Sequence, residues 1–165
     1  MASGKPKAKE GVEVVARNKR ARFDYSIEET LEAGIELVGS EVKSLREGNA
    51  NLSDSYAMPE REQLFVHNLN IGPYKAASML GHTPLRRRRL LLHRREIDKI
   101  LVKVKERGYS LIPLQIYFKQ GWAKVELALA KGKTHEDRRE DIKERETKRE
   151  VDRALRSRNK GRGKG

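Results

Sequence analysis

Apolar and polar residues alternate along a stretch near the N-terminus. Apolar side chains occupy the odd-numbered positions from Tyr25 to Leu37, and only Glu29 interrupts them. A period of two is that of a β-strand with one buried face. The pattern therefore predicts a long strand over residues 25–37, with Glu32 on its polar face.

A short helix and a hairpin are expected next. Ser40 is a candidate N-cap, and Gly48 lies just past the end of a helix predicted over residues 41–46. Two strand-like runs, over residues 50–58 and 64–71, are separated by a turn segment that begins with a proline. These two runs predict an antiparallel hairpin.

Residues 83–108 have the features of a helical region. Thr83 and Pro84 form a helix start, with threonine as N-cap and proline at the first helical position, and Gly108 marks the end. Apolar side chains recur at helical spacing in the second half, at Ile97, Ile100, Leu101 and Val104. The three leucines before His93 are interpreted as a break between two helices.

A second hairpin follows, where the period returns to two. The apolar positions are Ile112, Leu114, Ile116 and Phe118 in the first arm and Ala123, Val125, Leu127 and Leu129 in the second. A turn at residues 119–121 joins the arms, and Pro113 indicates an edge or a bulge because it has no N–H. Trp122 lies opposite the apolar face. Two interpretations stay open for it: a stacking surface, or a cover over one end of a barrel.

The predicted order of elements is three strands, a helical region and two strands. In the five-stranded OB-fold barrel a helix commonly sits between the third and fourth strands, and oligonucleotides bind to the surface and loops. We therefore expect a mainly β fold, an OB-fold-type small barrel with two to three helices. The alternative is a ferredoxin-like or double-stranded-RNA-binding α+β sheet, which needs a long helix early in the chain where this sequence offers none.

Charge and apolar content divide the 165 residues into three parts. Residues 131–165 carry 14 Lys/Arg, 8 Asp/Glu and only four apolar side chains, which cannot build a core. We expect a disordered basic N-terminus at 1–11, an RNA-binding core at 12–130 and a basic tail at 131–165. The tail has high helix propensity and should be disordered alone and helical when a polyanion neutralises it.

The overall charge identifies the class of partner. Lys and Arg number 37 against 24 Asp and Glu, for a net charge of +13 and an isoelectric point near 10.1. Such a field attracts polyanions, and nucleic acid is the leading partner. There is no cysteine, which excludes disulfides and cysteine-ligated metal sites. We expect no signal peptide, no spanning helix and a cytoplasmic location.

Clusters of basic residues are the candidate RNA contacts. Six arginines fall between positions 86 and 95, and arginine suits bidentate contacts to phosphate. Further basic residues precede the long strand or flank the last one. The candidates are Arg86, Arg87 and Arg89; Lys19, Arg20 and Arg22; and Lys124, Lys131 and Lys133. Because only 5% of residues are aromatic, recognition of a folded RNA by shape and backbone fits better than single-strand stacking.

Catalytic chemistry has weak support. The four histidines share no ligand spacing, so we expect no metal and no cofactor, and no P-loop, H-E-x-x-H or G-x-S-x-G pattern occurs. We therefore expect a protein that is not an enzyme. A metal-dependent nuclease built on Glu28, Glu29 or Asp54 is the alternative from another class, and it predicts magnesium-dependent turnover.

Six segments together form a specific signature, at residues 18–22, 27–34, 39–46, 53–56, 89–93 and 130–133. Through them the chain resembles the SsrA-binding protein (SmpB) family over almost its full length. The resemblance implies an OB-type barrel that binds the tRNA-like domain of transfer-messenger RNA (SsrA), and we expect the protein to be a monomer. It also implies delivery of that RNA to stalled ribosomes for trans-translation and ribosome rescue. A general ribosome- or RNA-associated OB protein is the alternative, and it predicts tolerance of Glu32→Ala.

The resemblance also implies roles for individual residues. Asn18, Glu32 and Leu91 match family positions associated with RNA binding. In the tail, the positions that match the family's decoding-centre pattern are Gly132, Asp137, Arg138 and Arg139. In the family, the residue just before the triplet 137–139 is often a histidine or an aromatic that can stack on a decoding-centre base. Here that residue is Glu136. Either His135, one position earlier, takes the stacking role, or stacking is weaker in this protein. Val151 and Leu155 would supply the apolar contacts of a tail helix in the message channel of the small subunit.

Overall fold

The computed structural model describes residues 11–74, 81–133 and 135–161, and within these ranges it contains nine strands and four helices. The strands are β1 (Val12–Arg17), β2 (Tyr25–Ile35), β3 (Ala50–Asn51), β4 (Tyr56–Glu60), β5 (Gln63–His67), β6 (Asn70–Ile71), β7 (Arg88–Leu91), β8 (Ser110–Lys119) and β9 (Trp122–Gly132). The helices are α1 (Ala21–Asp24), α2 (Gly39–Arg46), α3 (Arg94–Arg107) and α4 (His135–Gly161). The predicted N-terminal disorder at 1–11 falls almost entirely outside the described residues.

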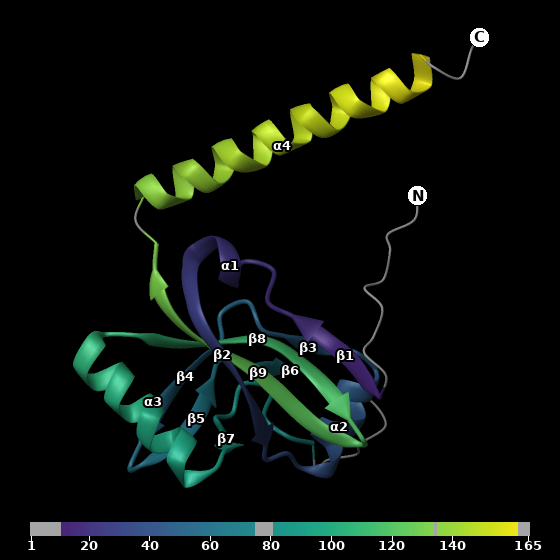
Figure 1. Ribbon diagram of the computed structural model, residues 1–165. Helices are drawn as coiled ribbons and strands as arrows, with labels where there is room; N and C mark the ends of the chain where they lie inside the picture. Colours follow the sequence, from purple (N-terminus) through teal and green to yellow (C-terminus); the bar gives the residue numbers. More distant parts are fainter. Residues whose placement is uncertain (1–10, 75–80, 134, 162–165) are drawn as a thin grey trace. The chain divides into compact units, whose positions relative to one another are not determined.

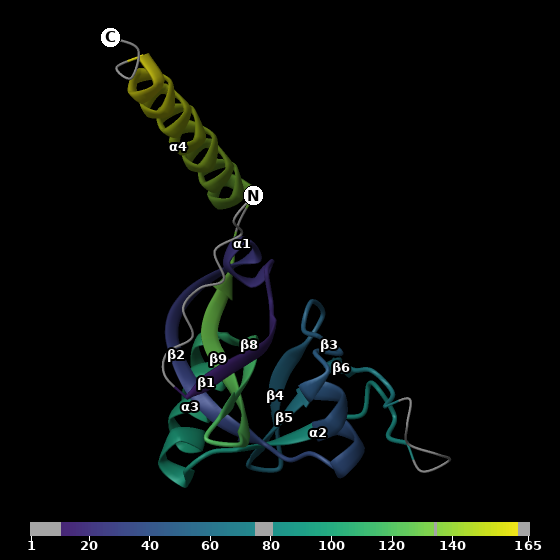
Figure 2. The same ribbon diagram turned by 90° about the vertical axis from the view of Figure 1, so that its right-hand side faces the viewer.

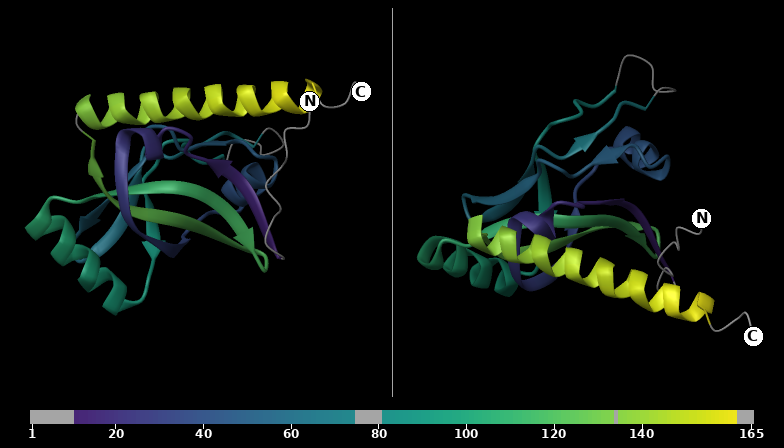
Figure 3. Two further views of the ribbon diagram at one scale, coloured as in Figure 1. Left: turned by 45° about the horizontal axis from the view of Figure 1, so that its top comes forward. Right: turned by 90° about the horizontal axis from the view of Figure 1, so that it is seen from above.

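Seven strands form one sheet that closes on itself (Figure 1). Their order is β1-β8-β4-β5-β7-β2-β9, and β8 also pairs with β9, so that every strand except β1 belongs to a closed ring. Closure leaves no unpaired edge in the ring, which is how small barrels avoid edge-to-edge association. Helices α2 and α3 lie at opposite sides of this barrel (Figure 3). The mainly β fold class is confirmed, with three helices accompanying the barrel.

The period-two patterns correspond to real strands. In β2, Ala33 and Ile35 are buried while Glu32 is exposed, as the alternation predicts. The β4–β5 hairpin also forms, with a tighter turn than expected because Pro59 pairs with Leu64 inside the ladder. The outer ends of the two predicted runs form a separate small sheet, β3 with β6, and Figure 2 shows it beside α2.

The β8–β9 hairpin is confirmed, but the prediction that the apolar residues of its first arm all share one face is wrong. The register shifts just after Pro113, where a bulge was one of the two predicted features. Because a bulge adds one residue to a strand, it exchanges the two faces. Ile112 and Leu114 therefore pack in a small second cluster, whereas Ile116 and Phe118 lie in the main core.

The predicted helix over residues 83–92 is wrong. This segment contains strand β7, which pairs with β5 on one side and β2 on the other. Leu90 is buried and Leu91 is 46% exposed, an alternation that the four preceding arginines concealed. Helix α3 begins only at Arg94, and it ends as predicted at Gly108, whose φ of 66° suits glycine.

One smaller expectation also needs correction, and one strand was not expected at all. Helix α2 is capped by Val38 rather than by Ser40, because the Glu41 carboxylate accepts a hydrogen bond from the Val38 N–H at 3.0 Å. Strand β1 was not predicted. It pairs with β8 through Val12 to Arg17 and lies outside the closed ring.

The chain separates into two units, residues 1–131 and 132–165, next to the boundary expected from composition. In the second unit, residues 135–161 form the single helix α4. The structure thus describes the tail as a helix. Disorder of the tail in the free protein stays a prediction. Among the described residues, no helix combines the length and apolar character needed to cross a membrane.

Candidate nucleic-acid interface

A shallow groove of about 520 Å³ runs over the outer surface of the barrel. It is lined by Leu31, Glu32, Gly34, Leu91, Leu92, His93, Glu96 and Lys124. Strand pairing sets Gly34 directly opposite Leu91, and a Cβ on Gly34 would lie 3.1 Å from the Leu91 Cβ. The absence of a side chain at Gly34 therefore lets β7 approach β2 closely and presents Leu91 in the groove.

Glu32 is held as an anion in this groove. The Tyr117 hydroxyl donates a hydrogen bond to its carboxylate, and the Lys119 Nζ lies 3.5 Å from Oε2. The hydrogen bond from Tyr117, helped by Lys119 and Lys124 and opposed by desolvation, holds the pKa of Glu32 below its ordinary value. An ionised carboxylate only accepts hydrogen bonds, so Glu32 suits base amino groups and 2′-hydroxyls rather than phosphates.

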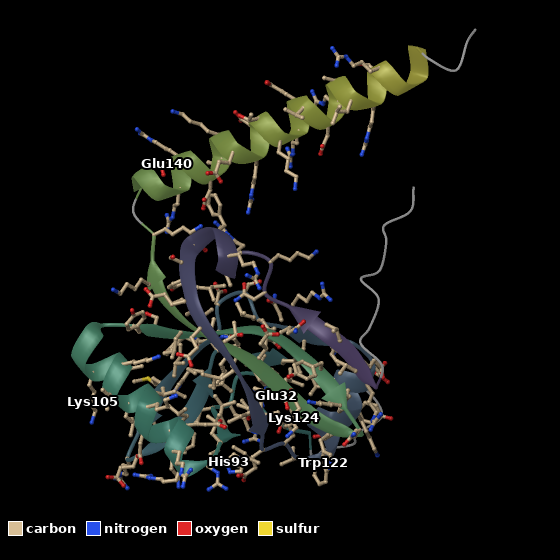
Figure 4. The ribbon with its side chains drawn as sticks, viewed as in Figure 1. Glu32, His93, Lys105, Trp122, Lys124 and Glu140 are labelled. Carbon is tan, nitrogen blue, oxygen red and sulfur yellow. The ribbon has the colours of Figure 1, made fainter. Side chains whose placement is uncertain are left out.

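Three of the predicted RNA-binding residues meet in this one place. Glu32 comes from β2, Leu91 from β7 and Lys124 from β9, and Figure 4 shows Glu32 and Lys124 close together. The groove thus combines an acceptor, an exposed apolar side chain and a cation. This combination can recognise a ribose or base edge and a phosphate of the same nucleotide chain.

The arginine cluster is engaged within the protein to an extent that the sequence did not indicate. Arg88 is fully buried, and both Arg86 and Arg88 donate to the carboxylate of Glu41. The other two predicted contacts are also paired: Arg87 with Glu60, and Arg89 with Glu36 at 3.0 Å. Arg87 and Arg89 still expose 57% and 43% of their side chains, so both remain available to a phosphate.

Glu41 and Arg88 form a buried network that the sequence analysis missed. Glu41 is also fully buried, and it accepts a further bond from the Arg86 Nε at 3.1 Å. The Arg88 guanidinium donates to the carbonyls of Leu69 at 2.7 Å and Pro84 at 3.1 Å. These bonds tie α2 to the start of β7, and so they position the strand that carries Leu91.

The Asn18 side chain hydrogen-bonds within the protein and does not line the groove. Its side-chain Nδ2 donates to the carbonyls of Leu52 and Pro113 at 3.3 and 3.2 Å, and its backbone N–H donates to the carbonyl of Leu114 at 2.7 Å. The bonds to Pro113 and Leu114 join the end of β1 to β8, and the bond to Leu52 joins it to the segment between β3 and β4. Lys19 and Arg20 next to it are exposed. Direct RNA contact by this segment, including Arg22, stays a prediction.

The remaining predicted residues fall at the end of the barrel and in the tail. The Lys131 Nζ lies 4.7 Å from the centre of the Tyr109 ring, and Lys133 pairs with Asp141. Val151 and Leu155 are half exposed and lie one turn apart on α4, on one face. Of the decoding-centre set, Gly132 is the last residue of β9, and Arg138 and Arg139 lie in the first turns of α4. The His135 and Asp137 side chains lie outside the described residues.

The groove residues lie within the part of the chain that matches a known protein family. The model of the family described as "SmpB protein" matches residues 15–157. The chain belongs to the SmpB family. Two proteins named SsrA-binding protein, from Myxococcus xanthus and Anaeromyxobacter dehalogenans, are each 66% identical to it. The first match covers 90% of this chain and 91% of the relative, and the second covers 86% and 87%.

More distant SmpB relatives also match most of the chain. The SsrA-binding protein of Geobacillus thermodenitrificans is 54% identical over 89% of this chain and 95% of its own. A solved chain, from a structure described as "tmRNA-SmpB: a journey to the center of the bacterial ribosome", is 47% identical with a TM-score of 0.62. That match covers 77% of this chain and 93% of the solved chain.

Leu91 offers a direct test of the groove in this SmpB-family protein. Leu91→Asp is expected to weaken RNA binding about tenfold, because it replaces apolar contact with a like charge facing phosphate. The melting temperature should change by only a few degrees, because Leu91 is exposed. Calorimetry and a binding titration measure the two effects.

The matched control for this substitution is the neighbouring leucine. Leu90 is 2% exposed and faces the core, so Leu90→Asp should lower the melting temperature strongly. A Leu91→Asp variant that melted like Leu90→Asp would contradict the placement of Leu91 at the surface.

Proposed function

We propose that this chain is the RNA-binding adaptor of trans-translation. In this role it binds the tRNA-like domain of transfer-messenger RNA and delivers that RNA to stalled ribosomes. The observation that carries the proposal is the groove of Glu32, Leu91 and Lys124 in a chain that belongs to the SmpB family. The relatives' name, SsrA-binding protein, and the structure described by tmRNA, SmpB and the ribosome support the same partners.

The two units have separate tasks in this proposal. The barrel unit binds transfer-messenger RNA through the groove, with Arg87, Arg89, Lys131 and the 18–22 segment contacting phosphates around it. The tail from residue 132 lies in the decoding centre and message channel of the small subunit. The protein works as a non-enzymatic monomer in the cytoplasm, where ribosomes translate.

A competition titration tests the proposal. The tRNA-like domain, labelled and transcribed in vitro, is bound to the protein near physiological salt and competed with total tRNA. Binding that survives a large excess of tRNA supports the adaptor, and equal displacement by any tRNA leaves only a general RNA-binding barrel.

The affinity of the protein for RNA should also fall steeply as the salt concentration rises, since phosphate neutralisation releases counterions.

Glu32→Ala sharpens this experiment. We expect the variant to lose preference for the tRNA-like domain over tRNA by about tenfold, since a lost acceptor in a recognition site costs about 1–3 kcal/mol. Glu13→Ala removes an exposed carboxylate of β1 outside the groove and is the charge-matched control. A Glu32→Ala variant that keeps full preference contradicts the assignment of the groove.

A further inference from the structure

Trp122 is the most exposed large apolar side chain of the described residues, with 73% of its surface accessible. It is also the only tryptophan of the chain. Such exposure contradicts the interpretation that Trp122 covers the end of the barrel. Within the part of the chain that the structure describes, neither a ring nor a cation packs against the indole. Most of the indole surface is therefore free to contact another molecule.

The position of Trp122 is fixed by a tight hairpin. It pairs with Lys119 across the turn formed by Gln120 and Gly121, whose φ angles are 51° and 80°. Positive φ at both central residues is the requirement of the two-residue turn that matches the twist of a hairpin. The backbone beneath the indole is thus held in one conformation, and little ordering is needed when a partner binds.

Trp122 shares a surface with the groove. On β9, Trp122 and Lys124 point to the same face because they are two residues apart, about 7 Å along the strand. Lys124 lines the groove, and Lys119, opposite Trp122, lies 3.5 Å from the Glu32 carboxylate. Figure 4 shows Trp122, the first residue of β9, near the labelled Lys124 and Glu32. The indole therefore extends the groove toward the hairpin tip.

The surroundings of the indole favour a nucleotide as its partner. No other large apolar side chain is exposed on β8 or β9, whereas Lys119 across the hairpin and Lys124 on the same strand are cations. An interface to a protein is usually built around a well-packed apolar cluster. A lone aromatic face between lysines is instead the arrangement that stacks a base and holds the adjoining phosphates.

We infer that Trp122 stacks on an unpaired base of the RNA that occupies the groove. This inference rests on the proposed function, and it adds a stacking contact at the tip of the β8–β9 hairpin. The base is one whose face is open, in a loop or at a bulge, because a base inside a helix already stacks on its neighbours. The RNA would thus be held at three points: Leu91 and Glu32 in the groove, and Trp122 beyond Lys124.

The intrinsic fluorescence of the full chain tests this directly, since all tryptophan emission comes from Trp122. The probe is the unlabelled tRNA-like domain, added until a parallel anisotropy titration with labelled RNA shows saturation. We expect strong quenching of Trp122 emission that follows the same binding curve. Unchanged emission at saturation overturns the inference while leaving RNA binding intact. Absence of any binding in the anisotropy titration overturns both the inference and the proposed function.

Substitutions provide the second arm. Trp122→Ala should bind the tRNA-like domain about tenfold more weakly, whereas Trp122→Phe, which keeps an aromatic face, should stay within about threefold. Trp122→Leu keeps an apolar side chain without a ring and should behave like Trp122→Ala. Val102→Ala, on the exposed surface of α3, is the control. Wild-type RNA affinity of Trp122→Ala overturns the inference. A change in Trp122 emission that occurs when extracted ribosomal proteins are added to the full chain, but not when RNA is added, also overturns it.

Discussion

Replacing Glu41 with alanine is expected to lower the free energy of unfolding by about 3–5 kcal/mol. The substitution leaves the guanidinium of Arg88 fully buried without its carboxylate, and removing one partner of a buried ion pair is far more costly than removing both. It also removes the acceptor that caps Val38 at the start of α2. Urea denaturation of the purified protein measures the loss.

Two further variants separate the ion pair from the helix it sits on. Glu47→Ala removes an exposed carboxylate just after α2 and should change stability by less than about 0.5 kcal/mol. The double substitution of Glu41 and Arg88 with methionine should recover much of the lost stability, because neither charge is then buried alone. A loss below about 1 kcal/mol for Glu41→Ala would show that water solvates Arg88 in the folded protein.

The same pair makes part of the stability depend on pH. Burial alone would raise the pKa of Glu41, but the hydrogen bonds from Arg86, Val38 and Arg88 outweigh it and lower the pKa from its usual 4.5. A lowered folded-state pKa contributes stability above the unfolded value that is lost as pH falls through the folded value. Wild-type stability should therefore fall below about pH 4.5, and that fall should be smaller in Glu41→Ala.

Truncating the chain after Lys133 is expected to abolish trans-translation on stalled ribosomes, measured as addition of a tag (tagging). Binding to the tRNA-like domain should stay within about threefold of the full chain. The cut keeps β9 whole and removes α4, which belongs to the other unit of the chain. The groove and Trp122 all lie before the cut. A translation system stalled on a message without a stop codon, supplied with transfer-messenger RNA, measures tag addition.

A shorter truncation provides the control for the tail. Removing only residues 162–165 takes away two basic residues and keeps α4, so tagging should persist. Loss of RNA binding together with tagging in the Lys133 truncation would contradict the division of tasks between barrel and tail. Val151→Asp with Leu155→Asp would then show whether the apolar face of α4 is what the ribosome contacts.

Local patterns determined much of the fold. A period of two predicted β2 and the β8–β9 hairpin, because one face of each strand is buried and the other is not. The glycine at 108 and the proline at 113 marked a helix end and a bulge for reasons that lie in a single residue's backbone. The charge balance predicted a polyanion as partner in the same way, since net charge needs no coordinates.

The candidate site was predicted in part. The basic clusters indicated RNA, but charge alone could not show that Arg88 is a core residue or that Arg86 serves Glu41. Glu32 and Leu91 were expected only through resemblance to the SmpB family. An acidic residue and a leucine have no feature in sequence that distinguishes a recognition contact from a solvated strand position.

The sequence by itself determined which segments are strands where alternation is clear, where the core ends and the tail begins, and the sign of the partner's charge. Only the tertiary structure decided that β7 is a strand, that Glu41 neutralises Arg88, and that Glu32, Leu91 and Lys124 share one groove with Trp122 beside it. The reason is physical. Alternation and composition act between neighbours along the chain, whereas ion pairs and binding surfaces join residues tens of positions apart, brought together only when the barrel closes.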